Sequence, residues 1–180
     1  MTVVTVGTFD GVHAGHRALL ADARRQADGR GKSLVAVTFS PRPDVALGRA
    51  RRPLPDLCSV AERVARLRAA GADHVEILSF TAELMRQSAA QFVAGLRERH
   101  RMTVLCVGSE FRCGRGGAGD LTALRALGVE VCAVPVLGRP GLTAKISSST
   151  IRRAVAAGVP APLAIHGWAP VLGHEMAEAT

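Results

Sequence analysis

The feature that most constrains this chain is a glycine-rich turn with two histidines, which directly follows a short apolar pattern. Residues 3–6 are all β-branched and lead into Gly7, as in a buried strand of a parallel sheet. The turn then carries His13 and His16 in the spacing His-x-Gly-His, and apolar residues recur at helical intervals over 17–25. A strand, a tight turn and a helix in this order predict an α/β fold with a parallel sheet.

The same turn has the chemistry of an anion site. Free backbone N–H groups and the helix dipole at the start of a helix favour a bound anion. Two imidazoles there can donate hydrogen bonds to phosphate oxygens as negative charge builds on them. The alternative is that His13 and His16 are only solvated turn residues, and the surrounding residues 7–16 count against it. We therefore expect a phosphate-binding turn.

Strand and helix patterns alternate along the rest of the chain, which predicts a Rossmann-like, doubly wound parallel sheet. Further strands are expected over 33–39, 75–80, 102–107 and 129–136, and helices over 59–71, 88–100, 121–128 and 147–158. Capping boxes are expected at Ser59 with Glu62 and at Ser88 with Gln91. Residues 40–57 carry four prolines and several arginines and are expected to form a long functional loop. The whole chain, 1–180, is expected to be one domain with a core over about 1–158 and a C-terminal extension over 159–180.

Charge and cysteine content narrow the classes of partner. The formal net charge is +8, but the arginines are interspersed with acidic residues and the only lysines are Lys32 and Lys145. This pattern favours a phosphate-rich small substrate over nucleic acid as the main partner. The four cysteines show neither a CxxC pair nor zinc spacing, so no protein metal site is expected. No apolar stretch approaches the ~20 residues of a membrane span, and no signal peptide is recognisable. A cytoplasmic protein is therefore expected, and its oligomeric state is not indicated.

A second motif opens the last expected helix. Residues 145–153 read Lys-Ile-Ser-Ser-Ser-Thr-Ile-Arg-Arg. Hydroxyls and backbone N–H groups at a helix start, with an arginine one turn later, can bind a polyphosphate. An ordinary serine N-cap with solvent-facing arginines is the alternative. Ligands of open α/β sheets bind beyond the carboxyl ends of the strands. The histidine turn, the loops after Phe39 and Val107, and this helix start are therefore expected to share one cleft.

Together the two motifs resemble a known family. Residues 7–16 (GTFDGVHAGH) and 146–152 (ISSSTIR) resemble the HxGH nucleotidyltransferase superfamily. Within it, the chain is similar to the FMN adenylyltransferase (FAD synthetase) module of bacterial bifunctional riboflavin kinase/FMN adenylyltransferases. Residues 38–43 are similar to the family's TFxPxP segment, 57–66 to the helix after it, and 108–114 to its GxDFxFG loop. The resemblance covers about the whole chain and implies a transferase domain without the kinase.

The resemblance also implies a reaction. An acceptor phosphate or phosphonate oxygen would attack the α-phosphate of a nucleoside triphosphate in line, and pyrophosphate would leave without a covalent enzyme intermediate. Mg²⁺ would be held mainly by the phosphates of the nucleotide and by water. The implied catalytic residues are His13, His16 and Arg152. The implied nucleotide-binding residues are Gly7, Thr8, Phe9, Asp10, Gly15, Ser147, Ser148 and Ser149. The implied acceptor-binding residues are Phe39, Pro41, Arg42, Glu110, Phe111 and Arg112. For Phe39 and Phe111, a purely structural place in the core is the alternative. For Asp10, orienting the turn or a metal-bound water and a purely structural cap both stay open.

Departures from the family pattern leave the acceptor open. Glu110 replaces the family's Asp, Cys113 its second Phe and Arg42 its His, while Arg49, Arg51 and Arg52 add charge to the loop. Five Phe, one Trp and no Tyr offer few flat surfaces for an isoalloxazine ring. Arginines would instead suit a compact anion. The first hypothesis is an FMN adenylyltransferase that makes FAD from FMN and ATP. The second is a CTP-dependent cytidylyltransferase that activates a small phosphonate or organophosphate. A non-catalytic nucleotide-binding module is a third, which the intact histidines disfavour.

Overall fold

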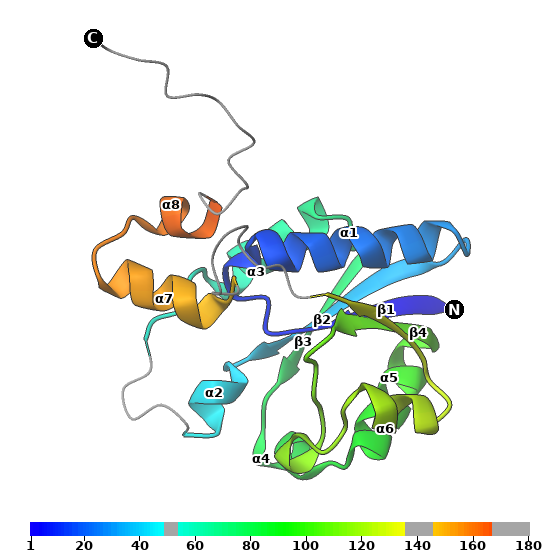
Figure 1. Ribbon diagram of the computed structural model, residues 1–180. Helices are drawn as coiled ribbons and strands as arrows, with labels where there is room; N and C mark the ends of the chain where they lie inside the picture. Colours follow the sequence, from blue (N-terminus) through cyan, green and yellow to red (C-terminus); the bar gives the residue numbers. More distant parts are fainter. Residues whose placement is uncertain (49–53, 136–145, 167–180) are drawn as a thin grey trace.

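The protein is built on a five-stranded, fully parallel sheet with the strand order β3-β2-β1-β4-β5 (Figure 1). The computed structural model describes residues 1–48, 54–135 and 146–166. The strands are β1 (Thr2–Val6), β2 (Ser33–Ser40), β3 (His74–Ser79), β4 (Met102–Gly108) and β5 (Glu130–Val134). The predicted α/β class and doubly wound parallel sheet are confirmed.

Helices cover both faces of the sheet. The expected helices are α1 (Ala14–Asp28), α3 (Val60–Ala69), α5 (Ala89–His100), α6 (Leu121–Ala126) and α7 (Ser148–Ala156). Helices α1 and α3 pack on one face, where Val3 and Leu34 are fully buried. Helices α5 and α6 pack on the other, where Val4 and Val37 are fully buried (Figure 1). Because both faces are covered, the central strands are apolar on both sides, as their sequence indicated.

Several boundaries differ from the sequence-based expectations. Both predicted capping boxes are present, and they begin α3 and α5. The expected loop over 40–57 is partly wrong, because it contains α2 (Pro43–Ala46), which proline favours at a helix start. The last strand ends at Val134, not at residue 136. Two short helices were not expected, α4 (Ala82–Arg86) and α8 (Ala161–His166). Arg49, Arg51, Arg52, Lys145 and residues 167–180 lie outside the described residues.

The carboxyl ends of the strands face the same edge of the sheet, toward α2, α7 and α8 (Figure 1). Helices α7 and α8 form a small core of their own with Ile146, Ile151, Ala164 and Ile165, and this core packs against Ala14 and Leu57. The start of α7 is thereby held beside the histidine turn. Within the described part of the chain, no helix has the length and apolarity needed to cross a membrane.

Candidate active site

The turn between β1 and α1 has an unusual backbone. Phe9, Gly11 and Val12 all have positive φ angles, of 48°, 80° and 45°. Such angles are rare for residues other than glycine, and for a β-branched residue such as Val12 they cost free energy. A turn of this kind persists only when its surroundings hold it, and all of residues 9–13 are buried. The backbone is therefore fixed before any ligand arrives.

The two histidines of the turn form a stacked pair. Their ring centroids are 3.7 Å apart with an interplanar angle of 20°. The ring of Phe9 meets His16 edge-on at 5.2 Å. The Nδ1 atoms of both imidazoles are buried and make no hydrogen bond, which leaves Nε2 as the ring nitrogen available to a ligand. A Cβ atom on Gly15 would lie 3.3 Å from the His13 ring, so glycine suits that position. His13 is 4% exposed, and the alternative of solvated turn residues is wrong.

Both imidazoles are uncharged at neutral pH. Burial, with a smaller contribution from the positive charge of Arg17, lowers the pKa of His13 to about 4. Burial lowers the pKa of His16 well below its usual range, with further contributions from His13, Arg63 and Arg17. Each neutral ring offers one N–H donor to a ligand. Because an anion would stabilise the protonated rings, polyphosphate binding should raise both pKa values.

This burial predicts a loss of stability in mild acid. In the unfolded chain the pKa of His13 is near 6.5, whereas in the folded protein it is about 4, so the unfolded state binds the proton first as the pH falls. Lowering the pH from 7 to 5 should therefore cost about 2 kcal/mol of unfolding free energy through this residue alone. Urea unfolding at several pH values measures the effect. The variant His13→Gln should lose this part of the pH dependence, and an unchanged pH profile in that variant would contradict the assignment.

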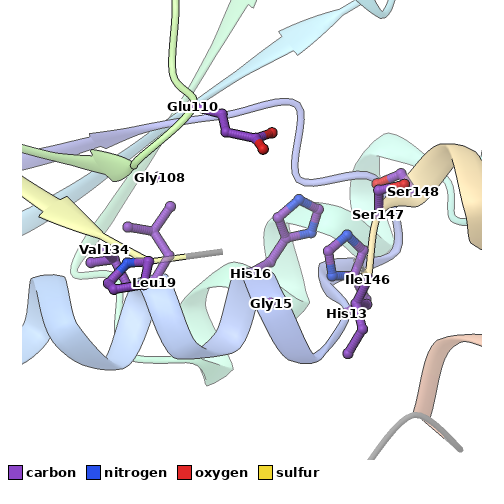
Figure 2. Close-up of a pocket in the computed structure, with 11 residues that line it drawn as sticks. His13, Gly15, His16, Leu19, Gly108, Glu110, Val134, Ile146, Ser147 and Ser148 are labelled. Atoms are coloured by element: carbon purple, nitrogen blue, oxygen red, sulfur yellow. The ribbon is translucent and has the colours of Figure 1, made fainter. Parts of the chain in front are cut away.

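The histidine pair lines a cavity of about 230 Å³, here called the histidine cavity (Figure 2). Figure 2 shows both rings standing above α1, with the Glu110 carboxylate on one side and Ser147 and Ser148 on the other. The residues that line the histidine cavity are His13, Gly15, His16, Leu19, Gly108, Glu110, Val134, Pro135, Ile146, Ser147 and Ser148. Imidazoles, serine hydroxyls and the start of α7 face one space, which suits the phosphates of a nucleotide.

Hydrogen bonds of Asp10 connect this turn to the segments around it. Its side chain is fully buried, and Oδ1 accepts a hydrogen bond from the backbone N–H of Leu57 at 2.8 Å. Oδ2 accepts from the Arg152 guanidinium at 2.6 Å. The backbone carbonyl of Asp10 accepts from the Ser148 hydroxyl at 3.0 Å. Asp10 thus orients the turn, and its carboxylate lines neither described cavity.

A second cavity of about 480 Å³ lies at the same edge of the sheet and is here called the aromatic cavity. Four of the five phenylalanines of the chain line it, Phe39, Phe80, Phe92 and Phe111. Phe39 and Phe80 meet edge-on at 5.4 Å. The remaining lining residues are Gly7, Thr8, Pro43, Leu47, Leu84, Met85, Arg112, Cys113, Gly114, Gly116 and Gly117. The fold gathers these rings in one place, although Phe39 and Phe92 also belong to the core and are only 8% and 6% exposed.

The predicted site residues divide between the two cavities. Of the predicted acceptor residues, Phe39, Phe111 and Arg112 line the aromatic cavity, whereas Glu110 lines the histidine cavity. Pro41 and Arg42 line neither cavity.

Of the predicted nucleotide residues, Gly7 and Thr8 line the aromatic cavity, and Phe9 lies against His16. Ser149 accepts a hydrogen bond from Arg152 at 3.2 Å. Arg42 and Arg152 are only 2% and 8% exposed. Each guanidinium is therefore in contact with carboxylates of the protein and presents little surface to a ligand.

Sequence reasoning did not find most of the aromatic cavity. Phe80 follows the end of β3, Leu84 and Met85 belong to α4, and Phe92 belongs to α5. No local motif links these residues to the histidine turn. Among the described residues, no group of three or more His, Cys, Asp or Glu side chains could hold a metal ion. The Glu110 carboxylate in the histidine cavity is compatible with a cation carried on a triphosphate.

Comparisons with known proteins agree with this geometry. Residues 1–150 match the model of a family described as FAD synthetase. A bifunctional riboflavin kinase/FMN adenylyltransferase of Escherichia coli (strain K12) is 31% identical, over 86% of this chain and 50% of that protein. An FAD synthetase of Listeria monocytogenes is 32% identical, over 87% of this chain and 64% of that protein.

A solved structure is also similar. A crystal structure described as a macrolide-efflux protein from Streptococcus pneumoniae superposes with a TM-score of 0.74 at 27% identity, over 86% of this chain and 50% of that one. The chain spans about half the length of the bifunctional relatives it matches.

Proposed function

Because the chain belongs to the FAD synthetase family, we propose that it transfers the AMP group of ATP to FMN, with formation of FAD and release of pyrophosphate. The aromatic cavity beside the histidine cavity is the observation that carries this proposal. Four phenylalanine rings suit the flat, apolar isoalloxazine system of a flavin. The neighbouring histidine cavity offers donors for the phosphates of a nucleotide.

In the proposed reaction, a phosphate oxygen of FMN attacks the α-phosphorus of ATP. The bond between the α-phosphorus and its bridging oxygen to the β-phosphorus breaks, and pyrophosphate leaves with that oxygen. His16 and His13 donate hydrogen bonds to the phosphate oxygens on which charge builds. Ser147, Ser148 and the start of α7 receive the β- and γ-phosphates. Arg152, predicted to bind phosphate directly, acts instead by holding α7 to Asp10. Mg²⁺ carried on the triphosphate would supply charge neutralisation, in a cavity that Glu110 also lines.

The aromatic cavity also bears on the second hypothesis, a CTP-dependent transferase for a small phosphonate. That hypothesis required free arginines around a compact acceptor. Arg42 is already surrounded by the carboxylates of Asp10, Asp44 and Asp56. A cavity of about 480 Å³ lined by four phenyl rings is also large and apolar for a small anion. FMN fits these observations better.

The direct test supplies the purified chain with Mg²⁺, with FMN or a small phosphonate as the acceptor, and with ATP or CTP, each combination in a separate reaction. We expect FAD and pyrophosphate in equal amounts with ATP. Pyrophosphate with CTP and a small phosphonate, without FAD from either nucleotide, would support the cytidylyltransferase instead. A folded chain that binds nucleotide but releases no pyrophosphate with either acceptor would indicate a non-catalytic module.

The aromatic cavity makes a separate prediction for FMN binding. Phe111 lies on the loop after β4 and is only partly buried, so its truncation should spare the core. The variant Phe111→Ala should weaken FMN binding about tenfold, because one stacked ring contributes about 1 kcal/mol or more. Quenching of flavin fluorescence measures the affinity. Leu127→Ala, an apolar truncation at an exposed site, is the control and should bind FMN like the wild type. Unchanged binding in Phe111→Ala would place the flavin elsewhere.

A further inference from the structure

Four charged side chains form a closed ring that joins the histidine turn, α2 and α7. The Arg152 guanidinium contacts Asp10 at 2.6 Å and Asp44 at 3.7 Å. The Arg42 guanidinium contacts the same two carboxylates, Asp44 at 3.1 Å and Asp10 at 3.6 Å. Acidic and basic groups thus alternate, and each of the four touches both groups of opposite charge. The side chains of Asp10, Arg42 and Arg152 are 0%, 1% and 9% exposed, so solvent screens these contacts only weakly.

The members of the ring come from three segments that build the site. Asp10 belongs to the histidine turn and also binds Ser148, which lines the histidine cavity. Arg152 lies one turn inside α7. Arg42 is the N-cap residue of α2, and its carbonyl accepts hydrogen bonds from the backbone of Val45 and Ala46. Helix α2 therefore cannot shift without a shift of Arg42.

Helix α2 in turn forms a wall of the aromatic cavity. Pro43 begins the helix and Leu47 follows its end, and both line that cavity. The ring joins this wall to the turn and to α7 at the carboxyl edge of the sheet (Figure 1). Three of the four side chains are buried and that of Asp44 is 38% exposed, so water can replace a strained contact only at Asp44.

Resting on the proposed function, we propose that Arg42 and Asp44 are positioning residues that couple the two substrate sites. Through the ion pairs of the ring, these two residues fix the position of α2 relative to the histidine turn and α7. A nucleotide that orders the turn and the start of α7 then also orders the wall against which FMN packs. The binding of one substrate tightens the binding of the other, and the two effects are equal by linkage.

The test measures FMN affinity with and without saturating Mg²⁺ and α,β-methylene-ATP, a nucleotide analogue that cannot release pyrophosphate. We expect the analogue to tighten FMN binding by about fivefold or more in the wild type. In Asp44→Asn the tightening, taken as the ratio of the FMN affinities with and without the analogue, should fall close to a factor of one. The ratio is the test because Asp44 lies in α2, a wall of the aromatic cavity, so the affinity without the analogue can change as well. The tightening of nucleotide binding by FMN should fall to the same extent.

Asp56→Asn is the matched control. Asp56 also contacts Arg42 and is 43% exposed, close to the 38% of Asp44. Its other ion pair within the described part of the chain is with Arg63 and not with Arg152. It should keep the coupling of the wild type. Equal losses in both variants would show that any loosening around Arg42 is enough, and would overturn the role of the ring.

The remaining outcomes separate this inference from the proposed function. A coupling factor of one in the wild type overturns the inference without the use of any variant, and leaves FAD formation untouched. Retained coupling in a folded Asp44→Asn protein overturns it as well. A chain that does not bind FMN would refute the proposed function, and the coupling would fall with it.

Discussion

Replacement of His16 by alanine is expected to lower the rate of FAD formation by ~10²-fold or more, the scale of losing one preorganised donor to a developing negative charge. His16 is fixed between the stacked ring of His13 and the edge of Phe9. Its low pKa keeps the ring neutral, so it contributes a directed N–H and not a diffuse positive charge. The loss should fall on kcat more than on KM, since this hydrogen bond strengthens as charge builds in the transition state.

A glutamine at the same position separates donation from packing. The side-chain amide of His16→Gln can present an N–H near the place of the imidazole Nε2, so this variant should recover part of the lost rate. Thermal unfolding of both variants shows whether the fold is kept. A well-folded His16→Ala protein with turnover within about tenfold of the wild type would remove His16 from the catalytic machinery.

The sequence predicted the fold well because its strongest signals are local. The β-branched run before Gly7, the two capping boxes and the alternation of strands with helices each act over a few residues. The histidine turn and the serine-rich helix start were found in the same way, and the parallel sheet brings them together. Local pattern and global topology agree in this half of the site.

The other half depends on contacts between residues far apart in the sequence. The aromatic cavity combines Phe39, Phe80, Phe92 and Phe111 from four different segments, so composition alone suggested a shortage of aromatic surface. Arg42 and Arg152 are predicted from the sequence as ligands of substrate anions, and Asp10, the carboxylate that they share, is distant from both in the sequence. Arg152 meets Asp10 across 142 positions, a pairing that no periodicity or motif spacing reveals.

That distant pairing predicts the largest effect on stability. Asp10→Asn should lower the free energy of unfolding by about 3 kcal/mol or more, because the buried Arg152 loses its close carboxylate partner and keeps only the longer contact to the partly exposed Asp44. The asparagine carbonyl can still accept the hydrogen bond from the backbone of Leu57, but Arg152 and Arg42 lose the carboxylate that they share. Chemical denaturation at pH 7 measures the change.

Asp73→Asn provides a control with the same kinds of partner at the surface. Asp73 accepts from the backbone N–H of Leu34 and pairs with Arg24, but its side chain is 44% exposed. Water can solvate Arg24 there after the carboxylate is lost, so the free energy of unfolding should fall by no more than about 1 kcal/mol. If the two variants lose similar stability, the charge of Asp10 does not hold the strained turn, and the backbone of Phe9, Gly11 and Val12 must be stabilised by packing alone. A much larger loss in Asp10→Asn would instead show that the Asp10 carboxylate stabilises the histidine turn together with α7 and α2.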